Sequence, residues 1–291
     1  MLGHYGLSTG MVLPYLLALA TEEQKKRWLP GIAAGDLVLC IAMTEPGTGS
    51  DLAGIRTSAR LSEDGTHYVL NGAKTFISGA RNSELCVVVA RTSSPTEQDR
   101  RAGLSLLIVP TDSEGFEYGR NLEKIGLKAS DTNELAFTDI RVPVENLLGE
   151  EGKAFSYLGQ NLPRERLMVG VDAVARAAAA VELAKAYVTE RNVFGRPVAS
   201  FQNTKFVLAE CDTEVEAAQA LVDRGDRTRT RRRVVPGRCG TNQVVHDRDR
   251  RPRRRQVPAA ARGGTDTCAN TPSPGSTPTC ASTASTADPA R

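Results

Sequence analysis

The last 70 residues lack almost every side chain from which a hydrophobic core is built. From Val222 to Arg291 the sequence contains no Leu, Ile, Met, Phe, Tyr, Trp, Lys or Glu. A segment without these side chains cannot bury enough apolar surface to offset the loss of chain entropy on folding. Residues 268–291 are a low-complexity run of Thr, Ser, Pro and Ala. We therefore expect residues 224–291 to form a disordered tail.

The tail also differs from the rest of the chain in charge. Residues 224–291 contain 15 Arg and five Asp, about +10, so the total of +3 leaves about -7 for residues 1–223. The arginines could neutralise nucleic-acid phosphates, the segment could be a solvated linker, or it could result from out-of-frame translation of GC-rich DNA. Because no aromatic residues alternate with the arginines, we do not expect nucleic acid as a partner. The change also interrupts a helical pattern, and we favour the out-of-frame interpretation.

Other absences limit the class of protein. No apolar run approaches the ~20 residues of a membrane-spanning helix, and no secretory leader is visible. The six cysteines show no C-x-x-C spacing, which argues against a zinc site or a disulfide framework, and we predict no metal. Cys40 and Cys86 lie in apolar runs and are expected to be buried as small hydrophobic residues. These features predict a cytoplasmic location.

The first 35 residues have a helical pattern. An apolar run from Met11 to Ala20 precedes Thr21, and Gln24 follows three residues later, which is the spacing of a capping box. We expect the helix that starts there to end at Pro30, because proline lacks the amide of a helical hydrogen bond.

Residues 36–148 change to short β-branched runs separated by turns. Asn71-Gly72 lies between two such runs, and this dipeptide is typical of a type I′ hairpin. The segment predicts a small, mostly antiparallel barrel or sandwich, so the fold class of the chain is α+β.

From residue 149 to 223 the helical period returns. We expect helices over 167–191 and 201–223, separated at Gly195-Arg196-Pro197. Pro163 suits an early helical position, which would place Glu165 in the first turn. Acidic residues are common there because the helix dipole favours them, so this position alone does not indicate catalysis.

The segment from Met43 to Gly54 is rich in glycine and hydroxyl side chains. Glycine lets backbone amides approach a ligand closely, and Thr44, Thr48 and Ser50 offer neutral hydrogen bonds. Spacing alone would be consistent with an ordinary surface turn. The full string Met-Thr-Glu-Pro-Gly-Thr-Gly-Ser-Asp-Leu-Ala-Gly, however, closely resembles the flavin-contacting signature of the acyl-CoA dehydrogenases.

Four further motifs follow in the order of that family, so the resemblance covers about residues 5–223. They are residues 71–79, 124–132, 162–167 and 191–195. The resemblance is strongest to the long-chain and isovaleryl types. It implies an acyl-CoA dehydrogenase-like α+β fold: a remnant of an N-terminal helical domain (1–35), a central β-domain (36–148), and an incomplete C-terminal helical bundle (149–223).

The resemblance also implies FAD as the cofactor. Phe76 would lie against the flavin where many relatives have Trp, and Ser78 would reach flavin N5. Arg191, Phe194 and Gln202 match residues that contact the FAD of a neighbouring subunit. The full set of cofactor-binding residues implied is Met43, Thr44, Gly49, Ser50, Phe76, Ile77, Ser78, Arg191, Phe194 and Gln202.

The implied reaction is the α,β-dehydrogenation of a fatty acyl-CoA to a trans-2-enoyl-CoA. Glu165 would be the catalytic base, and Ser50 and Arg166 would bind substrate. An electron-transferring flavoprotein would receive the electrons, and the intact family forms homotetramers. Most of the N-terminal region and the later bundle helices of the family pattern have no counterpart here. We therefore expect poor FAD binding and little activity from this polypeptide, the alternative being an inactive fragment or an interaction module with a basic tail.

Overall fold

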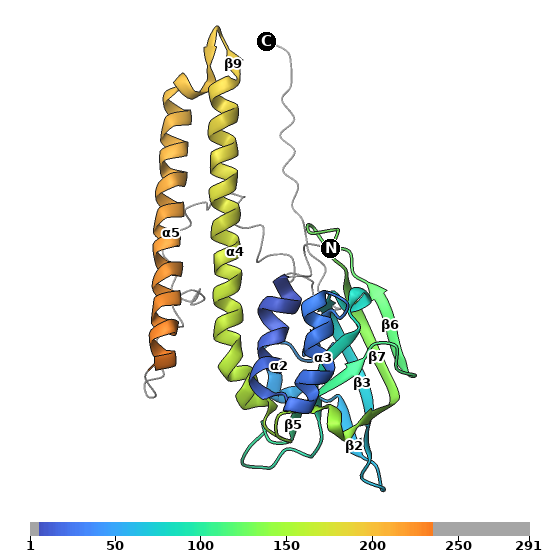
Figure 1. Cartoon of the computed structure of the whole chain (residues 1–291). Helices are drawn as coiled ribbons and strands as arrows, with labels where there is room; N and C mark the ends of the chain where they lie inside the picture. Colours follow the sequence, from blue (N-terminus) through green and yellow to red (C-terminus); the bar gives the residue numbers. More distant parts are fainter. Residues whose placement is uncertain (1–5, 235–291) are drawn as a thin grey trace.

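The computed structural model describes residues 6–234. Figure 1 shows its three parts: short helices at the start of the chain, a β-sheet, and a long helical hairpin that projects from them. The first part contains η1 (Ser8–Val12), α2 (Leu13–Leu19) and α3 (Glu22–Ala34). The sheet region contains β1 (Leu39–Ala42), η2 (Leu52–Gly54), β2 (Ser58–Leu61), β3 (His67–Ser78), η3 (Ala80–Asn82), β4 (Leu85–Arg91), β5 (Leu104–Pro110), β6 (Phe116–Asn121), β7 (Thr132–Pro143), η4 (Val144–Asn146) and β8 (Leu147–Leu148). The hairpin contains α4 (Ala154–Glu190), β9 (Asn192–Val193), β10 (Arg196–Pro197), η5 (Val198–Ser200) and α5 (Gln202–Val234).

Helix α3 starts as predicted but ends later. The capping box is present: the Gln24 amide donates to Thr21 Oγ1 (3.2 Å) and the Thr21 amide donates to Gln24 Oε1 (3.0 Å). The prediction that Pro30 ends the helix was wrong, because the helix continues to Ala34 and ends at Gly35, whose φ is 85°. Pro30 has no amide hydrogen to donate to the carbonyl of Lys26, one helical turn earlier. Both residues are exposed, so water can hydrate that carbonyl.

The strands form one mostly antiparallel sheet, as predicted. Its order is β6-β7-β3-β2-β4-β5-β8, and β1 pairs with β4 in parallel. The first six residues of β4 are buried, and they alternate between two cores. Because successive side chains on a strand point to opposite faces, Val87 and Val89 face the helical side while Cys86 and Val88 face the other.

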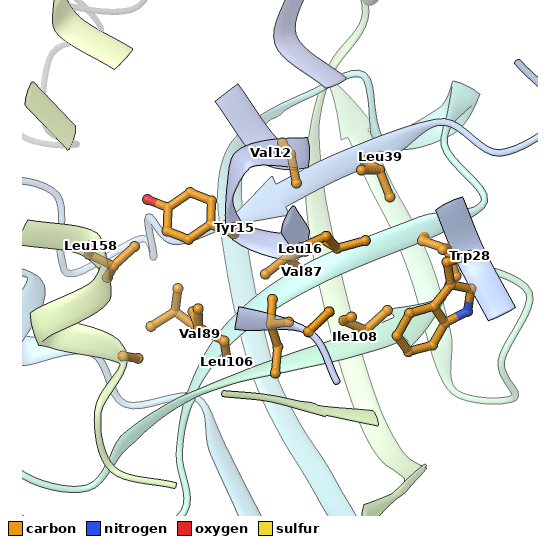
Figure 2. Packing of buried hydrophobic residues seen from close by; sticks show 14 of the residues in the cluster. Val12, Tyr15, Leu16, Trp28, Leu39, Val87, Val89, Leu106, Ile108 and Leu158 are labelled. Carbon is orange, nitrogen blue, oxygen red and sulfur yellow. The ribbon is translucent and has the colours of Figure 1, made fainter. Parts of the chain in front are cut away.

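The core on the helical side joins all three parts of the fold. It contains Tyr15 and Leu16 from α2, Trp28 from α3 and Leu158 from α4 (Figure 2). The second core lies where the sheet curls on itself, since residues of β1, β4 and β5 pack there against residues of β3, β6 and β7. Cys40 and Cys86 are fully buried in it as free thiols, which confirms that prediction.

The hairpin predicted at Asn71-Gly72 was wrong. Strand β3 continues through both residues, and its register against β7 shifts between Leu70 and Gly72. The irregularity is a bulge. In it, the side-chain Nδ2 of Asn71 donates to Asp139 Oδ1 (2.8 Å), and the backbone amide of Asp139 donates to Asn71 Oδ1 (3.0 Å). Glycine is required because its φ is +149° and a Cβ would lie 2.8 Å from Thr57 Cα.

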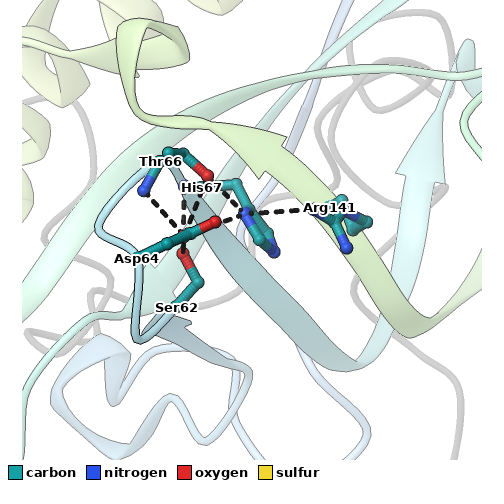
Figure 3. A network of polar contacts seen from close by, with 5 residues as sticks. All are labelled: Ser62, Asp64, Thr66, His67 and Arg141. Atoms are coloured by element: carbon teal, nitrogen blue, oxygen red, sulfur yellow. Dashed lines mark hydrogen bonds and ion pairs between the residues drawn. The ribbon is translucent and has the colours of Figure 1, made fainter.

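The actual turn between β2 and β3 is built around Asp64. Its Oδ1 accepts from the Ser62 hydroxyl (2.6 Å) and from the amide and hydroxyl of Thr66 (3.1 and 2.9 Å). Figure 3 shows this network beside His67 and Arg141 of β7. The donors from Ser62 and Thr66 lower the pKa of Asp64 to about 2. The side chain of Asp64 thus stabilises the turn between β2 and β3.

In the long hairpin, the start of α4 and the end of α5 both differ from the predicted boundaries. Helix α4 starts at Ala154, so Pro163 lies in its interior and Glu165 is not in its first turn. Helix α5 continues to Val234, so residues 224–234, predicted to belong to a disordered tail, are helical; residues 235–291 lie outside the described part of the chain. The hairpin exposes several large apolar side chains, among them Leu183 (72% exposed), Tyr187 (63%) and Phe206 (64%).

Candidate functional site

A cleft of about 1140 Å³ lies between the glycine-rich segment after β1, the loop after β4 and the first turns of α4. Five predicted site residues line it together: four predicted to bind the cofactor, of which Ser50 is also predicted to bind substrate, and one predicted to bind substrate alone. These are Met43, Thr44, Gly49, Ser50 and Arg166. Asp51, Leu52 and Ala53 of the same glycine-rich motif also line the cleft. Its other lining residues, which were not predicted from the sequence as site residues, are Glu97, Gln98, Asp99, Arg100, Arg101, Phe155 and Leu162.

The glycine-rich segment is fixed by hydrogen bonds within itself, and its backbone at Gly49 is open to the cleft. Glu45 and Thr48 exchange two backbone hydrogen bonds (2.9 and 3.0 Å), which close a tight turn, and the Thr48 hydroxyl donates to the Gly54 carbonyl (3.2 Å). A Cβ on Gly49 would meet no atom within 4 Å. The hydroxyls of Thr44 and Ser50 have no hydrogen-bond partner among the residues that the structure describes. The cleft wall thus presents open backbone and neutral donors.

The far wall of the cleft carries charges of both signs, Glu97 and Asp99 together with Arg100 and Arg101. Arg100 forms an ion pair with Asp51 (2.9 Å), but both side chains are mostly exposed, so the pair contributes little to stability. The Arg101 guanidinium lies 4.9 Å from the centre of the Phe155 ring. Buried more deeply, Arg91 joins the two walls, since it donates to the carbonyls of Ala53 (2.6 Å) and Arg100 (3.1 Å).

Glu165 is buried on α4 at the side of the cleft and does not line it. Only 9% of its surface is exposed. Its Oε1 accepts hydrogen bonds from the Tyr15 hydroxyl of α2 (2.8 Å) and from Asn161 Nδ2 (2.9 Å). Figure 2 shows Tyr15 pointing from α2 towards Leu158 of α4. Burial raises the pKa of Glu165, although the donors Tyr15 and Asn161 oppose the shift. Glu165 is therefore a carboxylate held in one orientation and biased towards protonation.

The predicted residues of β3 lie at the end of that strand. Phe76 has a φ of 60°, unusual for a residue with a side chain, and remains 38% exposed. Ile77 is buried in the second core, and Ser78 Oγ lies 3.3 Å from Thr132 Oγ1. The Thr75 amide donates to the Thr44 carbonyl (2.9 Å), which joins this strand to the cleft wall. None of the three lines the cleft described above.

Arg191, Phe194 and Gln202 are not brought to the cleft. Arg191 and Phe194 belong to the turn between α4 and α5, and Gln202 is the first residue of α5. Figure 1 shows this turn, with β9, at the end of the hairpin away from the sheet. Phe194 has a φ of 51° and is 95% exposed, with its ring 6.4 Å from that of Phe201. This turn is thus an exposed tip within the described part of the chain.

The sequence matches two parts of one family. The sequence model described as "Acyl-CoA dehydrogenase, middle domain" matches residues 40–140, and "Acyl-CoA dehydrogenase, C-terminal domain" matches residues 152–234. Together the matches cover more than half of the chain. The chain belongs to the acyl-CoA dehydrogenase family. This is a family of FAD-dependent oxidoreductases, and the α+β acyl-CoA dehydrogenase-like fold predicted from the motifs is confirmed.

Individual relatives agree with this membership. The mitochondrial long-chain specific acyl-CoA dehydrogenase of Sus scrofa is 43% identical over 219 residues, which are 75% of this chain and 50% of that protein. A solved acyl-CoA dehydrogenase from Geobacillus kaustophilus is 48% identical, with a TM-score of 0.72 over 77% of this chain and 58% of that one. One from Bacillus anthracis, complexed with FAD, is 36% identical, with a TM-score of 0.70 over 75% of this chain and 36% of that one. The chain thus spans about half the length of its curated relatives.

The cleft suits the cofactor of the family in its chemistry. A dinucleotide requires close backbone approach and several neutral donors, and the open backbone at Gly49 with the hydroxyls of Thr44 and Ser50 provides both.

Among the described residues no cluster of His, Cys, Asp or Glu could hold a metal ion, and no helix is long and apolar enough to cross a membrane.

Two groups of site residues had no clear signal in the sequence. Tyr15 approaches Glu165 from a helix 150 residues earlier in the chain, and no local pattern indicates such a contact. Asn161 precedes Glu165 by one helical turn and would have been found had α4 been predicted to start before Pro163. Arg91 ends a strand, where a cation is usually solvated, and only the folded structure brings two carbonyl groups of the cleft walls to it.

Proposed function

We propose that this chain carries the flavin- and substrate-facing part of an enzyme that oxidises fatty acyl-CoA thioesters to trans-2-enoyl-CoA. The observation that carries the proposal is Glu165: a buried, oriented carboxylate with a raised pKa, beside a cleft with open backbone and free hydroxyl donors. A base near its working range is more effective than an ordinary surface carboxylate, because it can both accept and release the proton near neutral pH.

In the proposed reaction Glu165 removes the α-proton of the thioester. Both of its hydrogen bonds, from Tyr15 and Asn161, go to Oε1, so Oε2 is the oxygen that takes the proton. Bound FAD supplies the acceptor for the hydride that leaves the β-carbon. The α-proton of a thioester is weakly acidic, so the site must also exclude water and stabilise the charge that develops on the thioester oxygen.

The cleft walls suit the two ends of such a substrate. Arg101 on one wall and Arg166 on α4 form no ion pair within the described part of the chain, so both can pair with the phosphates of a CoA ester. Phe155 and Leu162 provide apolar surface between them. In this proposal Met43, Thr44, Gly49, Ser50, Phe76, Ile77 and Ser78 bind FAD, and Ser50 and Arg166 also contact the substrate.

The remaining predicted partners are part of the proposal. Arg191, Phe194 and Gln202 reach the FAD of another subunit, to which their position on an exposed tip is suited. The intact enzyme is a homotetramer that passes its electrons to an electron-transferring flavoprotein. A cytoplasmic location stays a prediction, since the Sus scrofa relative is named as mitochondrial.

A second candidate is an inactive member of the family. The large apolar side chains exposed on α4 and α5, including Leu183 and Phe206, favour it, since a helix pair that leaves such side chains in water is weakly stabilised. In that case the described residues keep the fold without turnover.

One purification distinguishes the two. We would express the chain with excess FAD, record the flavin absorbance of the purified protein, and measure dye reduction with palmitoyl-CoA. Active dehydrogenase is expected to be yellow and to reduce the dye, and Glu165→Gln is expected to keep the flavin and lose turnover by at least ~10²-fold, the usual contribution of a general base. A colourless product, which is the poor FAD binding expected from the sequence, would decide for the inactive member and against the enzyme proposal. Unchanged turnover in Glu165→Gln would contradict the assigned base.

A further inference from the structure

Lys74 is a fully buried lysine next to the cofactor-facing segment. Its side chain is 0% exposed, although it lies on β3 only two residues before Phe76. Its Nζ donates to the Met43 carbonyl (2.9 Å) and to Glu45 Oε1 (3.0 Å). A lysine is almost never fully buried without a partner, so these two contacts define its role in the structure.

Glu45 connects the same point to a third segment. It is 7% exposed, and besides Lys74 it accepts hydrogen bonds from the backbone amides of Arg56 (2.8 Å) and Thr57 (2.9 Å). Those amides lie between the glycine-rich segment and β2. The ion pair therefore ties both ends of the glycine-rich segment, at Met43–Glu45 and at Arg56–Thr57, to β3.

A backbone hydrogen bond also joins the glycine-rich segment to β3, next to the ion pair of Lys74 and Glu45. Thr75, the neighbour of Lys74, donates its amide to the Thr44 carbonyl (2.9 Å). The two separate stretches assigned to FAD, residues 43–50 and 76–78, are thus joined through Lys74, Glu45 and this bond. A shift of the pair would move one stretch relative to the other.

The pair is a poor device for stability alone. Burying two charges costs several kcal/mol per ion, and apolar residues of similar size at such positions often stabilise a protein equally well or better. An ion pair with directed hydrogen bonds, in contrast, fixes carbonyl and amide groups at defined positions. We propose that Lys74 and Glu45 are positioning residues that hold the two FAD-facing stretches in register and thereby set the affinity for FAD.

This inference rests on the proposed function, and the charges around the pair make it dependent on pH. Lys74 faces Glu45, the Cys86 thiol of β4 lies close by with Cys40 of β1 beside it, and Arg91 interacts with Glu45. Burial lowers the pKa of Lys74 to about 8, which the Glu45 carboxylate only partly offsets. The pKa of Cys86 is raised by its contact with Cys40 and by burial, so the thiol stays neutral in the same range. FAD affinity should fall as the pH rises above about 8, where Lys74 loses its charge.

The test separates position from stability. Lys74→Met alone leaves Glu45 unpaired and can prevent folding, so the main variant is the double change Lys74→Met with Glu45→Met, which keeps the site filled. We expect this variant to unfold at a lower urea concentration than wild type, because the Arg56 and Thr57 amides lose their acceptor, yet to stay folded without urea. In the absence of urea it should bind FAD at least ~10-fold more weakly and lose the dependence of FAD affinity on pH. Lys185→Met, at an exposed ion pair on α4, is the control and should keep wild-type affinity.

A second measurement does not need the cofactor. Without FAD, hydrogen exchange of the Arg56, Thr57 and Thr75 amides should become at least ~10-fold faster in the double variant, while exchange in β4 stays the same. A double variant with wild-type FAD affinity and wild-type exchange overturns the inference. If wild type binds no FAD, the proposed function fails. The positioning role is then judged by hydrogen exchange alone, and an unchanged exchange rate at these amides in the double variant would contradict it.

Discussion

The hydroxyl of Tyr15 donates a 2.8 Å hydrogen bond to Oε1 of Glu165, and this bond joins the N-terminal helices to the long hairpin. Tyr15 is 2% exposed and is packed in the core on the helical side of the sheet. The orientation of the proposed base therefore depends on the packing of α2, which a substitution at position 15 can test without touching α4.

Tyr15→Phe should lower the free energy of unfolding by roughly 1.5–3 kcal/mol, the usual contribution of a hydrogen bond to a charged group. It should also raise the pKa of Glu165 further, because the Tyr15 hydroxyl stabilises the ionised form. Urea unfolding at neutral pH measures the first effect. Tyr187→Phe, at a side chain 63% exposed, is the matched control and should change the stability by less than about 0.5 kcal/mol. Equal losses in the two variants would show that the bond to Glu165 does not contribute.

Glu165→Gln should stabilise the protein at neutral pH. Burial raises the folded-state pKa of Glu165 above the ordinary value of 4.5, so the stability that its protonated form provides is present below that value and is lost as the pH rises through the folded pKa. Glutamine does not titrate, so the free energy of unfolding of the variant should rise relative to wild type as the pH increases from about 4.5 through the folded pKa of Glu165. Above that pKa the difference between the two proteins should stay constant. Urea titrations between about pH 4.5 and 8 measure the difference. Parallel stability curves for wild type and Glu165→Gln over this pH range would contradict the raised pKa.

Gly72→Ala tests the bulge in β3. The added Cβ would lie 2.8 Å from Thr57 Cα at a φ of +149°, so both the contact and the backbone strain oppose it. We expect a loss of roughly 2–4 kcal/mol from overpacking and strain together. Gly159→Ala on α4, where a Cβ meets nothing within 4 Å, should instead gain about 0.5–1 kcal/mol from helix propensity. Chemical denaturation of both variants gives the comparison, and a neutral Gly72→Ala would exclude the close approach.

The sequence could predict features whose cause is local. The capping box at Thr21 needs only two side chains three residues apart, and the burial of Cys86 follows from a continuous apolar strand. The turn at Asn71-Gly72 was wrong because the same dipeptide suits a bulge, and the choice depends on Thr57 and Asp139 from other strands. The start of α4 was wrong for a related reason: Pro163 costs one hydrogen bond, which packing of Leu158 and Leu162 on the core outweighs.

The candidate site divides in the same way. The motif Met43–Gly54 indicated one wall of the cleft because its residues are consecutive, and Arg166 was found through its neighbours in a motif. The opposite wall, Glu97–Arg101, has no such signature in the chain and is placed by the hydrogen bonds of Arg91. Lys74 gave no signal either, since a lysine in a strand is usually solvated, and only the folded position beside Glu45 identifies its role.

The exposed face of the hairpin gives the last prediction. Leu183 and Tyr187 are 72% and 63% exposed one helical turn apart, and contiguous apolar surface of this kind promotes association between molecules. Changing both to Ser should shift sedimentation velocity towards a smaller species at a given protein concentration, while the free energy of unfolding changes by no more than about 0.5 kcal/mol per site. Val174→Ser, at a position on α4 that is only 8% exposed, should instead destabilise the protein by about 1–3 kcal/mol without weakening association. Wild type that stays monomeric at every concentration would contradict the prediction, because the Ser variants would then have no association to remove.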